Sequence, residues 1–235
     1  MFSASAHLYD LIYAGIRDYA AESNTVAALL RRLAPAARSV LDVACGTGEH
    51  ARFLADRHGY EVDGLDLDPA FVRIAREKLV RGTVHEAAMI DFDLHRRYDA
   101  ILCLGSSIGY ARTLDGVRAA LATFRRHLAP GGVVIVEPWF SADRLRHGYC
   151  SFRSVEAPPL KICRMSHTEI DGGISRLRFE YLIGSEGGIE RASELHELGL
   201  FTHQEMESAF RDAGFESEYD PVGLLDRGLH VARPV

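Results

Sequence analysis

A loop with the sequence LDVACGTGEH combines small, flexible residues with acidic side chains. Gly46 and Gly48 permit a tight turn and let the backbone approach a ligand closely. Asp42 precedes the turn and Glu49 follows it, so a group bound there meets negative charge. Asp66 follows the next apolar run and suits hydrogen bonds to ribose hydroxyls. The pattern predicts a binding loop for a nucleoside-containing ligand that carries positive charge.

Two other nucleotide-binding loops fit these residues less well. A P-loop requires Gly-Lys-Ser/Thr at its end, and this loop lacks that sequence. A dinucleotide fingerprint fits by spacing, because Gly46, Gly48 and Ala51 match G-x-G-x-x-G/A. Acids that flank the helix start oppose the pyrophosphate that a helix N-terminus otherwise attracts. Spacing therefore leaves NAD open, whereas charge favours another ligand.

S-adenosylmethionine has the charges that this loop favours, since it carries an ammonium and a sulfonium beside a ribose and an adenine. Asp42 would hold the methionyl ammonium, Asp66 the ribose and Leu67 one face of the adenine. Gly46 and Gly48 would admit the methionyl-ribose part. The alternative is a purely structural strand-turn-helix whose acids cap the helix.

Alternating apolar runs and helical patterns must position this loop. Strands are expected at SVLDVA (39–44), YEVDGLDLDP (60–69), YDAILCLGSS (98–107) and VVIVEPW (133–139). Helices are expected at ARFLADRHG (51–59), AFVRIAREKL (70–79) and LDGVRAALATFRRHLAPGG (114–132). The alternation predicts an α/β fold with a Rossmann-like, doubly wound parallel sheet.

Residues 140–200 break this alternation and are rich in strand patterns. LKICRMSHTEI and ISRLRFEYLIG are joined by an Asp-Gly-Gly turn, and a third strand is expected near 193–200. A helix with a capping box at Thr202 and Glu205 follows, and VGLLDRGLHVA closes the chain as an edge strand. We expect one domain over 1–235, with a helical segment at 1–36, a core at 37–139 and 201–235, and an antiparallel insertion at 140–200.

Composition argues against a nucleic-acid-binding or membrane protein. The 235 residues carry a formal net charge of -6, whereas binding to a phosphate backbone rewards clustered Lys and Arg. No apolar run approaches the ~18 residues of a membrane span, and no secretory leader is evident. The four cysteines form no CxxC pair and have no His at ligand spacing. We expect reduced thiols, no metal site and a soluble, cytoplasmic protein.

Motifs along nearly the whole chain resemble a known enzyme family. LDVACGTGEH followed by GLDLDP resembles class I S-adenosylmethionine-dependent methyltransferases. The dTDP-linked aminosugar N,N-dimethyltransferases of antibiotic deoxysugar pathways, of the desosamine and mycaminose type, resemble this chain at LYDLIYAGIRDYAAE (8–22), SSIGY (106–110), VEPWF (136–140), RMSH (164–167) and DRGL (226–229). The resemblance implies S-adenosylmethionine as cofactor and a nucleotide-linked aminosugar as acceptor, with the insertion over the acceptor site. It leaves a homodimer open.

The resemblance also implies roles for residues at matching positions. The cofactor side would include Tyr19, Asp42, Ala44, Gly46, Gly48, Asp66, Leu67 and the Met89 amide. The reacting amine would lie beside Tyr9, Tyr13, Tyr110 and His167. The rest of the acceptor would contact Ser106, Ser107, Trp139, Arg164 and, through its diphosphate, Arg227. Three departures stand out. Ala87-Ala88-Met89 replaces the family's GDM, so Ala88 offers no acceptor to the adenine amino group; the N-terminal box is about one residue shorter; and Phe140 replaces a second Trp.

Each acceptor-side residue also has a structural explanation. Tyr9 and Tyr13 are four residues apart and could pack a helix against the domain. Trp139 could cap the core at the end of its strand. His167 and Arg164 alternate along a strand, where a solvated face is the ordinary place for polar side chains.

Three functions are compatible with these residues. They are N-methylation, in two transfers, of a dTDP-linked deoxy-aminosugar; methylation of another small amine or hydroxyl; and NAD-dependent oxidoreduction or non-catalytic nucleotide binding. Methyl transfer needs little side-chain chemistry because the sulfonium is already activated, so positioning dominates. The role of Arg227 distinguishes the first two functions. In a nucleotide-sugar enzyme it would contact the diphosphate, and otherwise it would pair with Asp220 or Asp226 at the surface.

Overall fold

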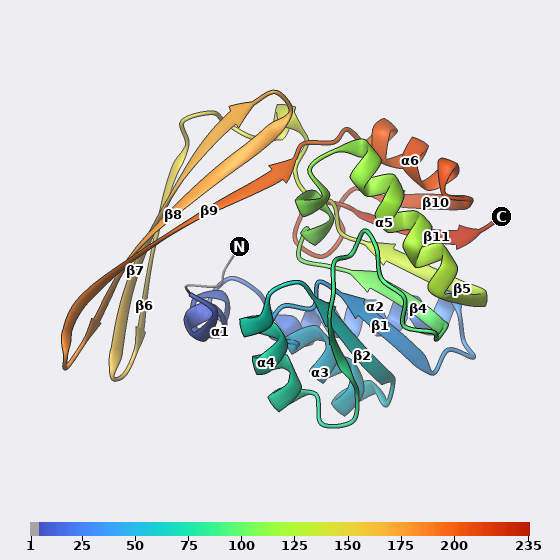
Figure 1. The fold of residues 1–235 in the computed structure, drawn as a ribbon, viewed down its shortest axis with the longest axis horizontal. Helices are drawn as coiled ribbons and strands as arrows, with labels where there is room; N and C mark the ends of the chain where they lie inside the picture. The colour runs from blue at the N-terminus through green and yellow to red at the C-terminus, as the bar shows by residue number, and fades with distance from the viewer. Residues whose placement is uncertain (1–4) are drawn as a thin grey trace.

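The computed structural model describes residues 5–235 and contains two β-sheets, the larger one covered by helices (Figure 1). The larger sheet has the strand order β10-β11-β5-β4-β1-β2-β3. Its strands are β1 (Ser39–Val43), β2 (Glu61–Asp66), β3 (Val84–Glu86), β4 (Tyr98–Cys103), β5 (Leu128–Val136), β10 (Phe215–Asp220) and β11 (Leu229–Pro234). β1 to β5 pair in parallel, whereas β11 pairs antiparallel with β5 and with β10. The α/β expectation is confirmed, with a sheet that is mixed at one edge.

Helices cover both faces of the larger sheet, as a doubly wound fold requires. They are α1 (Tyr9–Tyr13), α2 (Tyr19–Leu33), α3 (Glu49–His58), α4 (Pro69–Lys78), α5 (Leu114–His127) and α6 (His203–Asp212), with short 3-10 turns η1 (Ala6–Leu8), η2 (Ser107–Ala111) and η3 (Ala142–Arg144). α2, α3 and α4 share one apolar cluster with Val40 and its neighbours, and α5 and α6 share another with Leu41. Successive side chains of a strand therefore pack into apolar clusters on opposite faces of the sheet. None of the helices in the described part of the chain has the length and apolar run that a membrane crossing needs.

Local signals set the ends of these helices. α3 lies between Gly48 and Gly59, whose left-handed φ angles of 81° and 73° favour glycine. The Asp68 side chain caps α4 by accepting a hydrogen bond from the Ala70 amide at 2.9 Å. The predicted capping box that begins α6 at Thr202 is confirmed.

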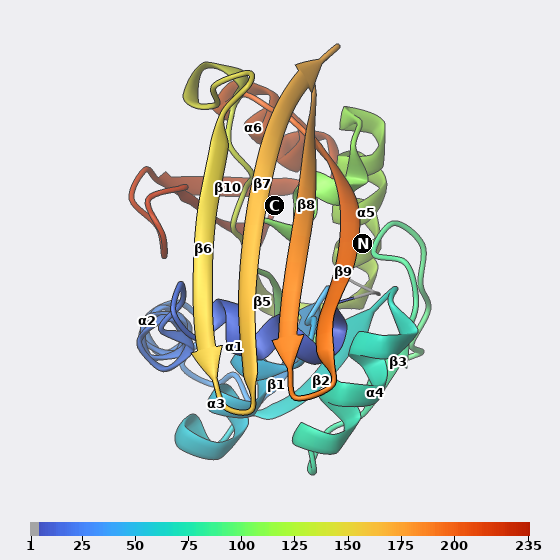
Figure 2. The same ribbon diagram turned by 90° about the vertical axis from the view of Figure 1, so that its left-hand side faces the viewer.

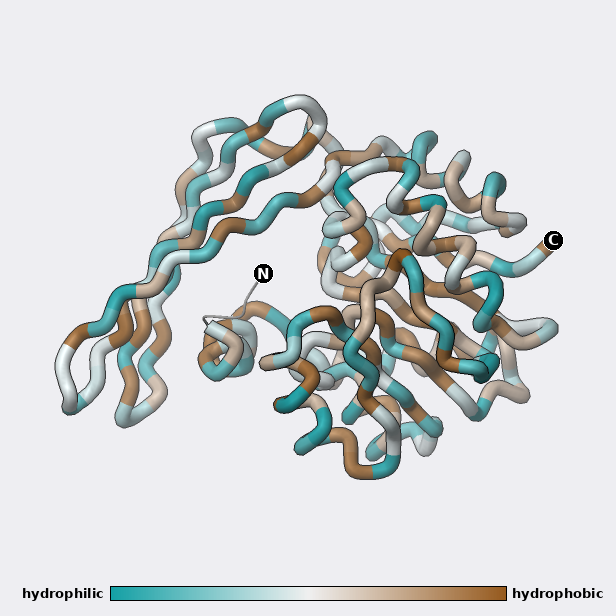
Figure 3. The backbone as a smooth tube through the Cα atoms, in the orientation of Figure 1, coloured by the Kyte–Doolittle hydropathy of each residue, from teal (hydrophilic) through white to brown (hydrophobic). Residues whose placement is uncertain are grey.

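The second sheet is a run of antiparallel hairpins that projects from the core (Figures 1 and 2). Its strands are β6 (Cys150–Ala157), β7 (Leu160–Asp171), β8 (Ile174–Ser185) and β9 (Gly188–Gly199). Hydrophobic and hydrophilic stretches alternate along these strands in Figure 3. Leu8 and Ile12, from η1 and α1, pack against Ile162 and Tyr181 on the inner face. The short N-terminal helices thus lie between this sheet and the core.

Three strand expectations need correction. The insertion has four strands rather than three. β6 was not predicted, because its side chains are mostly exposed and give no alternating pattern. The segment VGLLDRGLHVA was expected at the edge of the sheet, yet β11 lies between β5 and β10. The strand at this edge of the sheet is β10, whose FESEYD sequence is largely polar because only one of its faces is covered.

Candidate active site

A cavity of about 840 Å³ lies between the carboxyl ends of the parallel strands and the inner face of the second sheet. Open α/β sheets bind ligands where neighbouring strands diverge in chain order, here between β1 and β4. The candidate residues that line this cavity are Tyr9, Tyr13, Tyr19, Asp42, Ala44, Gly46, Asp66, Leu67, Met89, Ser107, Tyr110, Trp139, Arg164 and Arg227. The structure therefore brings together residues from both ends of the chain and from the insertion.

The glycine loop after β1 turns through left-handed backbone. Ala44 and Gly46 have φ angles of 56° and 57°, and the Gly46 amide donates to Asp66 Oδ2 at 2.8 Å. A left-handed alanine is strained, which is common where a loop is held in shape for a ligand. Gly48 does not line the cavity; a Cβ there would come within 3.2 Å of the Ala75 Cβ in α4. This glycine permits close packing between α3 and α4, and its expected cofactor contact stays a prediction.

Two buried carboxylates face the cofactor side of the cavity. Asp42 Oδ2 is buried and has no hydrogen-bond partner among the described residues. Burial, reinforced by the charge of Asp66 but opposed by His50, raises the pKa of Asp42 to about 6. Asp66 also accepts a hydrogen bond from the Asp68 amide at 2.9 Å, and burial raises its pKa. An orphaned buried carboxylate oxygen fits an ammonium group, which would supply the missing partner.

The outer part of this side is apolar. The Leu67 side chain lines the cavity and is 52% exposed, so it offers apolar surface to a bound ligand. Ala88 and Met89 form the neighbouring wall, and the Ala88 carbonyl accepts a hydrogen bond from the Asp91 amide at 3.2 Å. This wall offers apolar contact and backbone groups, but no side-chain acceptor at position 88.

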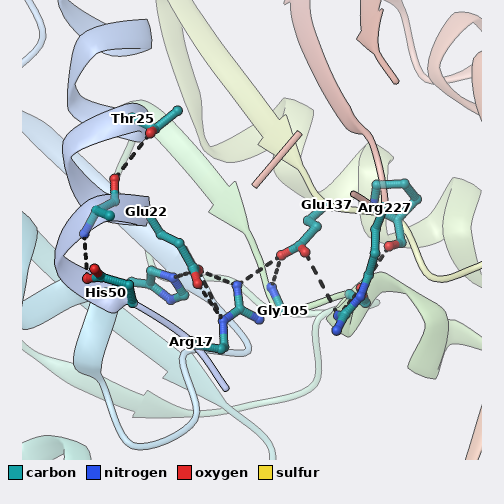
Figure 4. Close-up of polar contacts among 11 residues, drawn as sticks. Arg17, Glu22, Thr25, His50, Gly105, Glu137 and Arg227 are labelled. Atoms are coloured by element: carbon teal, nitrogen blue, oxygen red, sulfur yellow. Dashed lines mark hydrogen bonds and ion pairs between the residues drawn. The ribbon is translucent and has the colours of Figure 1, made fainter. Parts of the chain in front are cut away.

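A buried ionic network, which was not predicted, borders the cavity through Arg17 and His50 (Figure 4). Arg17 binds Glu22 and lies 3.2 Å from Glu137, while His50 Nε2 lies 2.8 Å from Glu22. Burial opposes ionisation of Glu22, but hydrogen bonds from His50 and Arg17 hold its pKa below the ordinary value. Glu137 also accepts a hydrogen bond from the Gly105 amide at 2.7 Å. The network joins the segment before α2, the start of α3 and the end of β5.

Glu137 had a signal in the sequence. It is the one acid in the otherwise apolar stretch VVIVEPW, and a charge at the end of a buried strand needs buried partners. Arg17 and Glu22 were quoted within the N-terminal motif but had no expected partners. Their contacts depend on which distant segments the fold brings together.

Arg227 belongs to the acceptor side of the cavity. Its Nη1 donates to Ser106 Oγ at 2.9 Å and lies 3.9 Å from Glu137 Oε1. Its guanidinium also lies 5.4 Å from the ring centroids of both Trp139 and Phe140. Within residues 5–235 it forms no ion pair with an aspartate of its own loop, so the surface-pair alternative is wrong. Ser106 itself is buried behind Arg227 and does not line the cavity.

The two polar candidates on β7, Arg164 and His167, lie on opposite faces of the second sheet. Arg164 is only 7% exposed on the inner face of β7, between the rings of Tyr13 and Phe179, at 5.3 and 4.7 Å from their centroids. Its Nη1 has no hydrogen-bond partner among the described residues. The solvated-face explanation of Arg164 is therefore wrong. His167 points to the opposite face, with its side chain 43% exposed, so the structure does not place it beside the acceptor.

Aromatic residues close the remaining sides of the cavity. The rings of Tyr9 and Tyr13 stack with centroids 4.2 Å apart, and Trp139 Nε1 donates to Ser175 Oγ at 2.9 Å. These residues pack against their neighbours and line the cavity as well, so the two explanations are compatible. Tyr110 contacts His196 of β9, a cavity-lining residue that was not predicted.

Comparisons with known proteins agree with this geometry. Residues 40–132 match the family described as methyltransferase domain. The chain is 42% identical to dTDP-3-amino-3,6-dideoxy-alpha-D-glucopyranose N,N-dimethyltransferase of Streptomyces fradiae, over 97% of this chain and 90% of that protein. It is 38% identical to dTDP-3-amino-3,4,6-trideoxy-alpha-D-glucopyranose N,N-dimethyltransferase of Streptomyces venezuelae, over 97% of both chains.

Solved structures give the same result. Streptomyces venezuelae DesVI has a TM-score of 0.93 and 38% identity, and the match covers 98% of both chains. A SAM-bound amino pentose methyltransferase from Micromonospora echinaspora has a TM-score of 0.88 and 36% identity over 97% of both chains. The NAD-dependent alternative is therefore wrong. The chain belongs to the family of S-adenosylmethionine-dependent methyltransferases that includes the dTDP-aminosugar N,N-dimethyltransferases.

Proposed function

We propose that this enzyme transfers two methyl groups, one after the other, from S-adenosylmethionine to the amine of a dTDP-linked deoxy-aminosugar. One observation carries the proposal: a single cavity is lined by Asp42, which has an orphaned buried carboxylate oxygen, by the buried Arg164 and by the half-buried Arg227. Asp42 suits a cationic cofactor, whereas Arg164 and Arg227 suit an anionic acceptor. The names of the relatives from two Streptomyces species describe such acceptors.

Residues of the core hold the cofactor. Asp42 Oδ2 binds the methionyl ammonium, and the free lone pairs of Asp66 accept hydrogen bonds from the ribose hydroxyls. Leu67 and Met89 cover the adenine, and Tyr19 borders the same cavity. The bound cofactor supplies an activated methyl group on a sulfonium, so the chain needs to position the acceptor rather than activate the donor.

The N-terminal helix and the insertion hold the acceptor. Tyr9, Tyr13 and Tyr110 border the reacting amine, and their aromatic walls exclude water from it. Arg227 binds the diphosphate with the guanidinium donors that Ser106 does not use. Arg164, the Ser107 hydroxyl and the Trp139 ring contact the remainder of the nucleotide sugar. In this proposal, residues 140–200 form the wall over the acceptor.

Mass spectrometry tests the function directly. The enzyme is incubated with S-adenosylmethionine and a panel of dTDP-linked 3-amino and 4-amino deoxysugars, with the matching free aminosugars as controls. We expect products with one and then two added methyl groups from at least one nucleotide-linked sugar. Equal turnover of the free aminosugars would favour a general small-amine methyltransferase instead.

We also propose that the enzyme is a cytoplasmic homodimer without a nucleic-acid partner. The outer face of the second sheet is uncovered and carries large apolar side chains, with Phe152 61% and Met165 53% exposed (Figure 2). Such a patch supports association of two copies. The free cysteines support a cytoplasmic location. The net charge of -6 supports the absence of a nucleic-acid partner. Light scattering should give a dimer for the wild type and a monomer for Met165→Lys, and a wild-type monomer would contradict the assembly.

A further inference from the structure

A chain of three titratable side chains begins in the wall of the cavity, which Tyr110 and His196 line, and ends at the buried Glu194. The Tyr110 hydroxyl lies 2.8 Å from His196 Nδ1, and His196 Nε2 lies 3.5 Å from Glu194 Oε2. Tyr110 lies in η2, while His196 and Glu194 are on the inner face of β9, where both side chains are almost fully buried. The chain leads from the cavity wall into the interior of the second sheet.

Glu194 is held in place by groups from other elements. Its two carboxylate oxygens accept hydrogen bonds from the Ser5 amide at 2.9 Å and from the Ser5 hydroxyl at 3.0 Å. The Tyr181 hydroxyl donates to Glu194 Oε2 at 3.1 Å. Burial opposes ionisation, but the nearby His196 ring and the hydrogen bonds from Ser5 and Tyr181 hold the pKa of Glu194 below its ordinary value. An ionised carboxylate therefore lies beside the far side of the imidazole.

The reaction needs a place for protons. An alkyl amine is mostly protonated near neutral pH, and only the neutral form has the lone pair that attacks the methyl group. Each attack on the methyl group leaves the amine nitrogen positively charged, and the first product must lose a proton before the second transfer. A side chain of the cavity wall beside the amine can take this proton directly.

We propose that Tyr110, His196 and Glu194 form a proton relay for the acceptor amine, an inference that rests on the proposed function. An N–H bond of the acceptor ammonium breaks as its proton moves to the Tyr110 oxygen. The O–H bond of Tyr110 breaks in the same step, and that proton binds His196 Nδ1. The amine keeps the electron pair, Tyr110 is a neutral phenol again, and the new imidazolium lies beside the Glu194 carboxylate. Tyr110 touches the acceptor, whereas His196 and Glu194 act through it.

The surroundings of His196 keep its imidazole neutral at rest, so that one ring nitrogen is free of a proton. Burial lowers the pKa of His196, although the nearby Glu194 carboxylate opposes this. Arg164 of β7 lowers the pKa further, and the Tyr110 hydroxyl is a polar neighbour from η2. Burial also raises the pKa of Tyr110 well above its ordinary value, so its hydroxyl keeps a proton at rest. The resting relay is thus a phenol beside a neutral imidazole.

Nitrogen NMR of ¹⁵N-histidine-labelled enzyme tests the resting state without any acceptor. We expect neutral His196 with its proton on Nε2 and with Nδ1 accepting from Tyr110, and we expect Tyr110→Phe to change the Nδ1 shift. The opposite tautomer, or an imidazolium at neutral pH, would overturn the relay. Because this measurement needs no substrate, it separates failure of the relay from failure of the proposed function.

Single-turnover methyl transfer over a range of pH tests the step itself. His196→Asn can still accept from Tyr110 but cannot bind the proton, so we expect its rate near pH 7 to fall about 100-fold. The deficit should shrink as pH rises, because amine that has lost its proton in solution no longer needs the relay. Glu194→Gln should show the same trend more weakly. His167→Asn, on the opposite face of the same sheet, is the matched control and should behave as wild type.

Two results would refute the relay while the enzyme stays active. One is a His196→Asn rate equal to that of wild type. The other is a loss that is equally large at every pH, which would make the Tyr110–His196 contact a structural tie between η2 and β9. Melting temperature and affinity for S-adenosylhomocysteine, measured on each variant, identify a variant that fails to fold.

Discussion

Replacing Arg227 by Ala removes a guanidinium that faces the acceptor side of the cavity from the loop between β10 and β11. Only Nη1 has a hydrogen bond in the structure, to Ser106 Oγ, so other donors are available to a diphosphate. One charge-assisted hydrogen bond is worth about 1.5–3 kcal/mol, so its loss should raise the KM for the nucleotide-linked sugar by about 10-fold to 150-fold. The diphosphate is remote from the reacting amine, so kcat at saturation should change little.

The fold should tolerate this change. Glu137 retains Arg17 at 3.2 Å and the Gly105 amide at 2.7 Å, so its buried charge stays paired. Steady-state kinetics with varied nucleotide sugar provides the measurement, and calorimetry with S-adenosylhomocysteine should give unchanged affinity. Arg118→Ala is the control, because Arg118 pairs with Asp115 and Asp212 and does not line the cavity.

Two results would refute this role of Arg227. One is an unchanged KM for the nucleotide-linked sugar. The other is an equal rise in KM for the free aminosugar, which has no diphosphate to lose. Either result would limit Arg227 to holding Ser106 and the rings of Trp139 and Phe140 in place.

Three further changes test the cofactor side and the core. Affinity for S-adenosylhomocysteine should fall about tenfold between pH 7 and pH 5, because Asp42, with a pKa of about 6, must be ionised to bind the ammonium. In Asp42→Asn, calorimetry should show weak binding without this pH dependence, and a wild-type slope in that variant would contradict the assignment. Asp66→Ala should weaken the same binding by about 1.5–3 kcal/mol, since it removes the ribose acceptor as well as the partner of the Gly46 amide; unchanged affinity would rule out the ribose contact. Burial, with a smaller effect of His203, lowers the pKa of His230 to about 3, so the unfolded chain binds a proton near pH 6.5 that the folded chain does not. His230 should therefore contribute a loss of about 2 kcal/mol of unfolding free energy between pH 7 and pH 5, and denaturant titrations should show it as the difference between wild type and His230→Phe over this range.

The sequence predicted the parts of the fold whose signals are local. β1, β4 and the second half of β5 are largely apolar runs because both faces of the sheet are covered, and Thr202 with Glu205 marks its helix start by side-chain chemistry alone. The helix expected over 114–132 ends at His127, and residues 128–132 belong to β5. β6 and β10 carry few apolar residues because much of each strand faces solvent, so their patterns do not differ from those of loops.

The cofactor side of the site was also predictable, because its residues lie close together in one strand-turn-helix and at the end of the next strand. The acceptor side depended on which face of each strand points inward. Alternation from buried Ile162 would have placed Arg164 inside and His167 outside, and alternation from Leu198 would have placed His196 inside. Contacts such as Arg17 with Glu137 join residues 120 positions apart, and no local pattern reports them.

The packing of Leu8 and Ile12 against the second sheet has a consequence for how acceptor specificity can change. The cofactor cradle belongs to the core, whereas the acceptor walls come from the insertion and from α1, which share one apolar cluster. The Ser5 hydrogen bonds to Glu194 tie the same two segments together. A chimera that imports the insertion of a relative with another sugar would meet foreign side chains along α1. A chimera with a new acceptor pocket therefore needs two segments from the same relative: residues 5–18 and residues 140–200 must be exchanged together.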